Sequence, residues 1–111
     1  MMYTVNVTIR ARLDMREIYE YIAHTLLAPE TAEKQYTRIE TAVYSLDQMP
    51  ERFRRYEKEP WKSRNLRIIP IDNYIVFYTV DNENRVVSVI RIMYGRRNTE
   101  KELDDMAQQD Y

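Results

Sequence analysis

The sequence of 111 residues has no cysteine, one glycine, four prolines and one histidine. The lack of cysteine excludes disulfide bonds, thiol catalysis and cysteine-ligated metals, and favours a cytoplasmic protein. Because His24 is the sole imidazole, we expect no histidine-based metal site and no Ser/His/Asp catalytic triad. We also expect no cofactor. No stretch approaches ~18 consecutive apolar residues, and the first residues do not read as a secretory leader. We therefore expect no membrane span.

The net charge of −1 conceals strong patterning. Residues 51–70 carry seven basic and three acidic side chains, whereas residues 98–111 carry one basic and five acidic ones. A near-neutral total argues against strong non-specific binding to nucleic acid, which depends on many lysines and arginines. The basic segment is interpreted either as a partner surface or as a solvated loop that is partly self-paired.

The first half of the chain predicts a strand followed by two helices. Apolar and polar residues alternate over residues 4–9, which is typical of a half-buried strand. From about Ala11, apolar residues recur every four positions as far as Leu26, which predicts an amphipathic helix. Pro29 ends this helix and suits the first turn of a second one. The second helix ends near residues 48–50, so the two helices form an antiparallel hairpin.

The second half predicts three strands and a short helix. Residues 65–71, 74–80 and 86–92 are rich in β-branched and aromatic side chains, and residues 81–84 supply turn chemistry. Residues 51–63 show neither the apolar spacing of a helix nor the alternation of a strand, which indicates a loop. Thr99 and Glu102 form a capping box for the short C-terminal helix. The prediction is one α+β domain over residues 1–111, with the helical hairpin on one face of a largely antiparallel sheet of about four strands.

Two features of the last strands bear on function. Gly95, the only glycine, follows the last strand, and we expect it to be needed there for its backbone freedom. Alternation along the strand at residues 74–80 places Ile75 and Phe77 on one face of the sheet and Tyr74 and Val76 on the other. Both faces are largely apolar. One face packs against the helices. The other face either binds a partner or is covered by Phe53, Tyr56 and Trp61 of the loop at residues 51–63.

These elements carry a family resemblance. The chain resembles the RelE/ParE superfamily of toxins from type II toxin–antitoxin systems, once called plasmid stabilisation proteins, from about Tyr3 to Leu103. The strings that carry it are LDMREIYEYIA at 13–23, LLAPETA at 26–32, SLDQMPERF at 45–53, NYIVFY at 73–78 and VIRIMYGRRN at 89–98. The resemblance implies a cognate antitoxin and one of two activities: RelE-like members are ribosome-dependent, metal-independent mRNA endoribonucleases, and ParE-like members inhibit DNA gyrase.

The chain departs from the RelE-like pattern at two positions. That pattern has an arginine where this chain has Ile75, and a tyrosine in the last helix where this chain has Leu103, although Arg97 matches the arginine beyond the glycine. Because several converging donors are needed to stabilise a phosphoryl transition state, we favour a ParE-like binding protein over an enzyme. For a nuclease, the candidate catalytic residues would be Lys62, Arg64, Arg67, Arg96 and Arg97.

The resemblance also suggests which residues meet partners. The residues expected to contact the cellular target, gyrase or the ribosome, are Arg91, Tyr94 and Arg97. Those expected to contact the antitoxin are the basic Arg52, Arg54 and Arg55 with the apolar Ile75 and Phe77. A homodimer, or a heterotetramer with the antitoxin, is compatible with this arrangement.

Overall fold

The computed structural model describes residues 2–109 and contains a five-stranded sheet in the order β1-β5-β4-β3-β2. The strands are β1 (Thr4–Val7), β2 (Arg54–Arg55), β3 (Leu66–Ile71), β4 (Tyr74–Asp81) and β5 (Val86–Tyr94). Only the β1–β5 pair is parallel among these described strands. The largely antiparallel sheet is therefore confirmed. The sheet has one strand more than the four expected, because β2 lies within residues 51–63, which were expected to form a loop.

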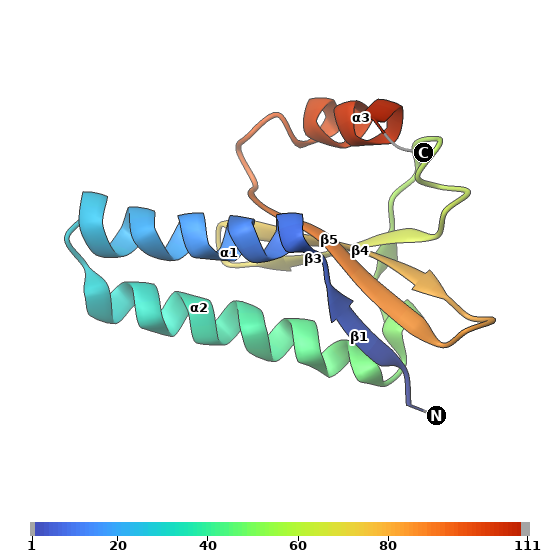
Figure 1. The fold of residues 1–111 in the computed structure, drawn as a ribbon, viewed down its shortest axis with the longest axis horizontal. Helices are drawn as coiled ribbons and strands as arrows, with labels where there is room; N and C mark the ends of the chain where they lie inside the picture. Colours follow the sequence, from blue (N-terminus) through green and yellow to red (C-terminus); the bar gives the residue numbers. More distant parts are fainter. Residues whose placement is uncertain (1, 110–111) are drawn as a thin grey trace.

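The predicted helical hairpin is also confirmed (Figure 1). Helix α1 (Ile9–Glu20) begins two residues earlier than expected, because the Thr8 hydroxyl accepts a hydrogen bond from the Ala11 amide at 3.2 Å and caps it. It continues into a π-helical turn, η1 (Tyr21–Thr25), before α2 (Pro29–Tyr44) runs back. No helix within residues 2–109 has the length and apolar content needed to cross a membrane.

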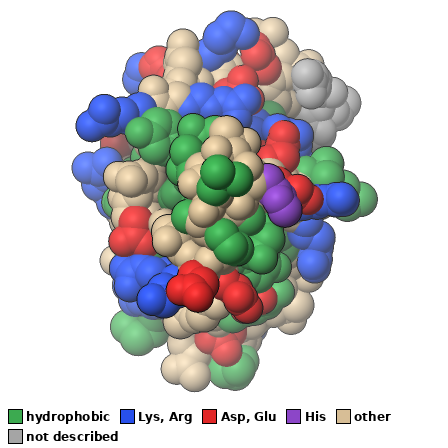
Figure 2. All heavy atoms as spheres, turned by 90° about the vertical axis from the view of Figure 1, so that its left-hand side faces the viewer, with side chains coloured by type: hydrophobic (Ala, Val, Ile, Leu, Met, Phe, Trp, Pro, Cys, Tyr) green, Lys and Arg blue, Asp and Glu red, His purple; other side chains and the backbone are tan. Residues whose placement is uncertain are grey.

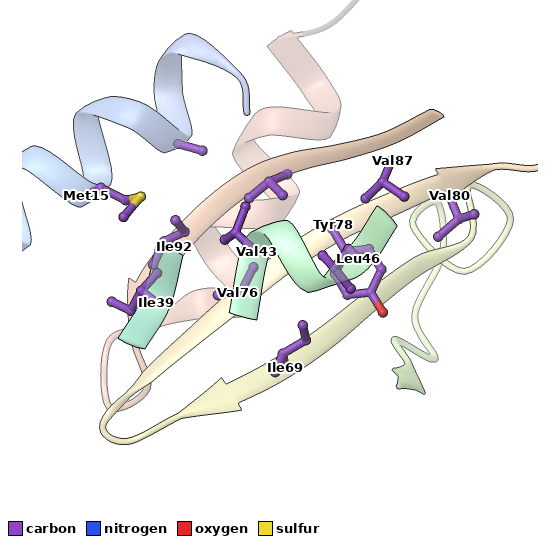
Figure 3. Packing of buried hydrophobic residues seen from close by; sticks show 12 residues of the cluster. Met15, Ile39, Val43, Leu46, Ile69, Val76, Tyr78, Val80, Val87 and Ile92 are labelled. Carbon is purple, nitrogen blue, oxygen red and sulfur yellow. The ribbon is translucent and has the colours of Figure 1, made fainter. Parts of the chain in front are cut away.

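The main core lies between the hairpin and the sheet (Figure 3). Ile39 and Val43 of α2 point toward Val76 and Ile92 on the central strands. Tyr78 is fully buried in this core, and its hydroxyl donates to the carbonyl oxygen of Pro50 at 2.6 Å. Burial raises the pKa of Tyr78 to about 12, so the ring is neutral at physiological pH.

The opposite face of the sheet carries a second core, which helix α3 (Thr99–Gln109) covers. Phe77 packs there with Trp61 from the β2–β3 loop and Leu103 from α3. The indole Nε1 of Trp61 donates to the Leu103 carbonyl at 3.0 Å. The chain therefore covers much of this face itself, with Tyr56 also packed against it. Phe53, in contrast, packs on the hairpin side.

The predicted cap of α3 was wrong by one residue. Asn98, rather than Thr99, caps the helix, since its side-chain oxygen accepts from the Lys101 amide at 3.2 Å. Thr99 is the first helical residue. Glu102 does not complete a capping box, because its carboxylate pairs with Arg91 instead.

The expected role of Gly95 was also wrong. No glycine in the described chain has a positive φ, so backbone freedom does not explain its presence. Its amide donates to the Asn73 carbonyl oxygen at 2.8 Å. A Cβ at this position would lie 3.3 Å from the same oxygen and 3.6 Å from Cδ1 of Ile75. The position is therefore distinguished by its close approach to the Asn73 carbonyl oxygen and to Ile75, and not by a positive φ.

Gly95→Ala should therefore lower the free energy of unfolding by up to about 1 kcal/mol, the low end of the cost of overpacking, because residue 95 is exposed. At a position with the same φ and no close neighbour, an alanine would instead stabilise the protein by about 0.4–1 kcal/mol, because it lowers the conformational entropy of the unfolded chain. Urea denaturation of the two proteins measures the difference. A stabilised Gly95→Ala variant would contradict the close-approach explanation.

Candidate functional site

A groove with a basic rim lies at the β2 edge of the sheet and extends over its α3 side, with a volume of about 830 Å³. Ile68, Ile75 and Phe77 line it from the sheet, and Arg54 and Arg55 line it from β2. The remaining lining residues are Phe53, Tyr56, Glu57, Lys58, Arg67 and Thr99. We call this the basic groove. It combines an apolar floor with cations, the arrangement that suits an acidic amphipathic peptide.

The structure brings together four of the five residues expected to contact the antitoxin. Arg54, Arg55, Ile75 and Phe77 all line the basic groove. Phe77 is only 2% exposed, so it supports the floor, whereas Ile75 is half-buried and more accessible.

Arg52 lies elsewhere and has a structural task. Its guanidinium donates to the carbonyl oxygens of Gln48 at 2.6 Å and Met49 at 3.1 Å, and to the Ser45 hydroxyl at 3.0 Å. These groups follow the end of α2, where carbonyls lack helical partners. We therefore assign Arg52 to the cap of this segment and not to the basic groove.

The five nuclease candidates are divided among three places. Arg67, which also lines the basic groove, donates to the carbonyl oxygens of Glu51 and Phe53 at 3.0 and 2.8 Å. Lys62 and Arg64 belong to the β2–β3 loop, where the Arg64 guanidinium lies 4.9 Å from the ring centre of Trp61. Arg96 and Arg97 belong to the turn after β5.

A buried ion pair connects the hairpin to the sheet. Arg91 on β5 is 3% exposed, and its Nε and Nη2 donate to the Asp14 carboxylate of α1 at 2.8 and 3.1 Å. The Ile92 amide donates to the same carboxylate at 2.9 Å. This burial leaves almost no surface of Arg91 accessible to a target, so we give Arg91 a structural role.

Sequence reasoning missed Asp14, although a signal was present. Asp14 lies four residues before Ile18, and therefore on the apolar stripe of α1. A carboxylate on a buried stripe needs a charged partner. The partner could not be identified from the sequence, because Arg91 is 77 residues away.

Glu102 extends this pair toward the surface. Its Oε1 accepts from Arg91 Nη1 at 3.1 Å and from Arg97 Nη2 at 3.3 Å. The hydrogen bond from Arg91 is the main cause that holds the pKa of the Glu102 carboxyl below its usual value. Arg97 is half-exposed, with 49% of its side chain accessible.

Tyr94 and Arg97, both expected to contact the target, line a crevice of about 160 Å³. Tyr21 of η1 and Tyr74 of β4 also line it. The rings of Tyr74 and Tyr94 pack edge to face, with their centres 5.9 Å apart. The other lining residues are Asp14, Glu17, Ile18, Ile92 and Met93. We call this the tyrosine crevice.

The hairpin tip beside the crevice is apolar. Leu26 and Leu27 are exposed there, and Leu27 has a φ of 54°. Figure 2 faces this end of the molecule and shows hydrophobic side chains gathered beside His24. Exposed apolar groups of this kind are common where proteins meet.

Comparison with known proteins gives a consistent family. Residues 5–99 match the family described as the ParE toxin of the type II toxin–antitoxin system parDE. No curated protein matches the sequence.

The fold is shared with solved toxins. The chromosomal ParDE system from P. aeruginosa is 22% identical with a TM-score of 0.68, over 84% of this chain and 96% of that chain. A chain of the toxin–antitoxin complex RelBE2 from Mycobacterium tuberculosis is 19% identical with a TM-score of 0.61, over 85% of this chain and 99% of that chain. A mutant of E. coli toxin RelE in the free state is 17% identical with a TM-score of 0.59, over 92% and 93%.

Arg91→Met should lower the free energy of unfolding by up to about 3–5 kcal/mol, because it leaves the buried Asp14 carboxylate with the partly exposed Arg10, at 3.3 Å, as its cationic partner. Arg16→Met is the matched control. Arg16 pairs with Glu20 on the surface of α1, so its loss should cost at most about 1 kcal/mol. Chemical denaturation measures both variants. Equal stability of Arg91→Met and the wild type would show that the fold does not depend on this pair.

Proposed function

This chain belongs to the ParE toxin family of type II toxin–antitoxin systems, and we propose that it acts by binding and inhibiting a cellular target. DNA gyrase is the first candidate, on the strength of the family resemblance. The observation that carries the proposal is the tyrosine crevice, where Tyr21, Tyr94 and Arg97 are accessible around a packed floor. Tyrosine and arginine dominate the binding energy of many protein interfaces.

Two apolar replacements support binding over RNA cleavage. Ile75 lines the basic groove, and Leu103 is fully buried beside Trp61. Both positions therefore contribute packing where the RelE-like pattern has polar groups. Loss of a single preorganised donor can cost about 2.7–4 kcal/mol of transition-state stabilisation. A site without two such groups is a poor nuclease.

We further propose that the antitoxin places an acidic, amphipathic segment in the basic groove. Arg54 and Arg55 are exposed at the rim, and Ile75 offers apolar surface between them and α3. Such a segment would bury its apolar side and pair its charges with the rim. Binding as an added strand and binding as a helix both remain compatible with this groove.

The function is tested by incubating the purified protein separately with supercoiling gyrase and with ribosomes that translate a defined mRNA. We expect inhibited supercoiling and intact mRNA. Cleaved mRNA with active gyrase would establish the RelE-like alternative. No effect in either assay would indicate an interaction module without toxicity toward these targets.

Arg97→Ala should reduce toxicity in cells, because Arg97 lines the crevice, whereas Arg96→Ala should leave toxicity unchanged. Both side chains are exposed, so neither change should alter the free energy of unfolding by more than about 1 kcal/mol. Growth after induction and thermal denaturation provide the two measurements. Equal loss of toxicity in both variants, or in neither, would refute this assignment.

Reversal of Arg54 and Arg55 to Glu should slow association of the antitoxin, most strongly at low salt, because rim charges chiefly set the association rate. Ile75→Ala should instead shorten the lifetime of the complex. Reversal of Arg16 and Lys34, which lie on the hairpin, is the control. Surface plasmon resonance gives both rates. Slower association in the hairpin variant alone would place the antitoxin on the hairpin.

A further inference from the structure

We propose that Glu102 is a positioning residue, which holds the guanidinium of Arg97 at the tyrosine crevice and is itself held by the buried pair of Arg91 and Asp14. The contribution to target binding rests on the proposed function. The positioning itself is a property of the free protein and can be tested without a target.

The inner end of this network is rigid. The Asp14 carboxylate receives two bonds from Arg91 and a third from the Ile92 amide. Two bonds from one planar guanidinium fix its orientation as well as its position. Because both residues are buried on regular elements, Nη1 of Arg91 is presented in one direction, toward α3.

The middle of the network depends on the docking of α3. Glu102 lies in the first turn of this helix, next to Leu103, which is fully buried. The bond from Trp61 Nε1 to the Leu103 carbonyl fixes the same turn. The position of the Glu102 carboxylate is therefore set from two sides, by the helix and by Arg91.

The outer end is the part that needs support. The backbone amide of Arg97 donates to the Tyr94 carbonyl oxygen at 3.0 Å, which fixes the turn but not the long side chain. The Nη2 group of Arg97 lies 3.3 Å from the Glu102 oxygen that Arg91 also uses. Immobilising such a side chain before binding should improve affinity by about 2- to 10-fold.

The Glu102 carboxylate has a second, opposite effect. It neutralises part of the charge of Arg97, so its removal would strengthen the attraction between Arg97 and any acidic group of the target. Two variants separate the effects. Glu102→Gln removes the charge, whereas Glu102→Asp keeps the charge and shortens the reach by one methylene. Positioning predicts that both variants weaken binding, and neutralisation predicts that Glu102→Asp resembles the wild type.

The matched control is Glu100→Gln. Glu100 lies in the same turn of α3 and carries the same charge, but it pairs with Lys58 and not with Arg97. NMR relaxation of the Arg97 Nε–H group reports the order of its side chain in the free protein. We expect Glu102→Gln and Glu102→Asp to loosen this group, and Glu100→Gln to leave it unchanged, with the backbone spectrum preserved in all three.

Gyrase binding of each variant, alone and combined with Arg97→Ala, completes the test. We expect a 2- to 10-fold loss for Glu102→Gln and no further loss in the Arg97→Ala background. An ordered Arg97 in Glu102→Gln, tighter binding, or losses that simply add would overturn the proposal. If Arg97→Ala binds gyrase like the wild type, Arg97 is not part of the gyrase contact, and the relaxation data alone decide the positioning. If the wild type does not bind gyrase, gyrase is not the target, and the relaxation data again decide the positioning alone.

Discussion

The buried pair of Arg91 and Asp14 is the constraint on which the rest of the structure depends. Removing two charges from water costs several kcal/mol per ion, and only excellent geometry with further hydrogen bonds offsets that cost. Here the two-bond contact and the Ile92 amide supply them. The pair also fixes α1 against β5, because a slipped helix would leave a buried charge unpaired.

The two faces of the sheet are covered by unequal means. The hairpin buries a continuous core of aliphatic side chains with Tyr78 on one face, whereas the other face is covered by one loop and the short helix α3. The thinner cover leaves the basic groove open above Ile75. Its neighbour Tyr74 points to the opposite face and lines the tyrosine crevice. Adjacent residues of β4 thus serve two separate surfaces.

Local patterns were sufficient to predict most of the fold. The hairpin follows from apolar residues spaced at the helical period, and the long strands follow from runs of β-branched and aromatic side chains. Both signals depend on near neighbours only. The two-residue strand β2 has too few residues to show a period, and its pairing with β3 is set by tertiary contacts. The cap at Asn98 was missed because Thr99 also fits the cap position by type.

The candidate site was predicted less completely, since residue type does not determine burial. Arg91 and Arg97 are both arginines near the end of β5, yet one is enclosed by Asp14 and Glu102 while the other reaches solvent. In the same way, Arg52 caps a helix end, while Arg54 reaches the groove. At positions 75 and 103 the chain has packing where a nuclease would have donors. Packing at these two positions supports the proposed role, in which the protein inhibits a partner through shape and fixed charge rather than through chemistry.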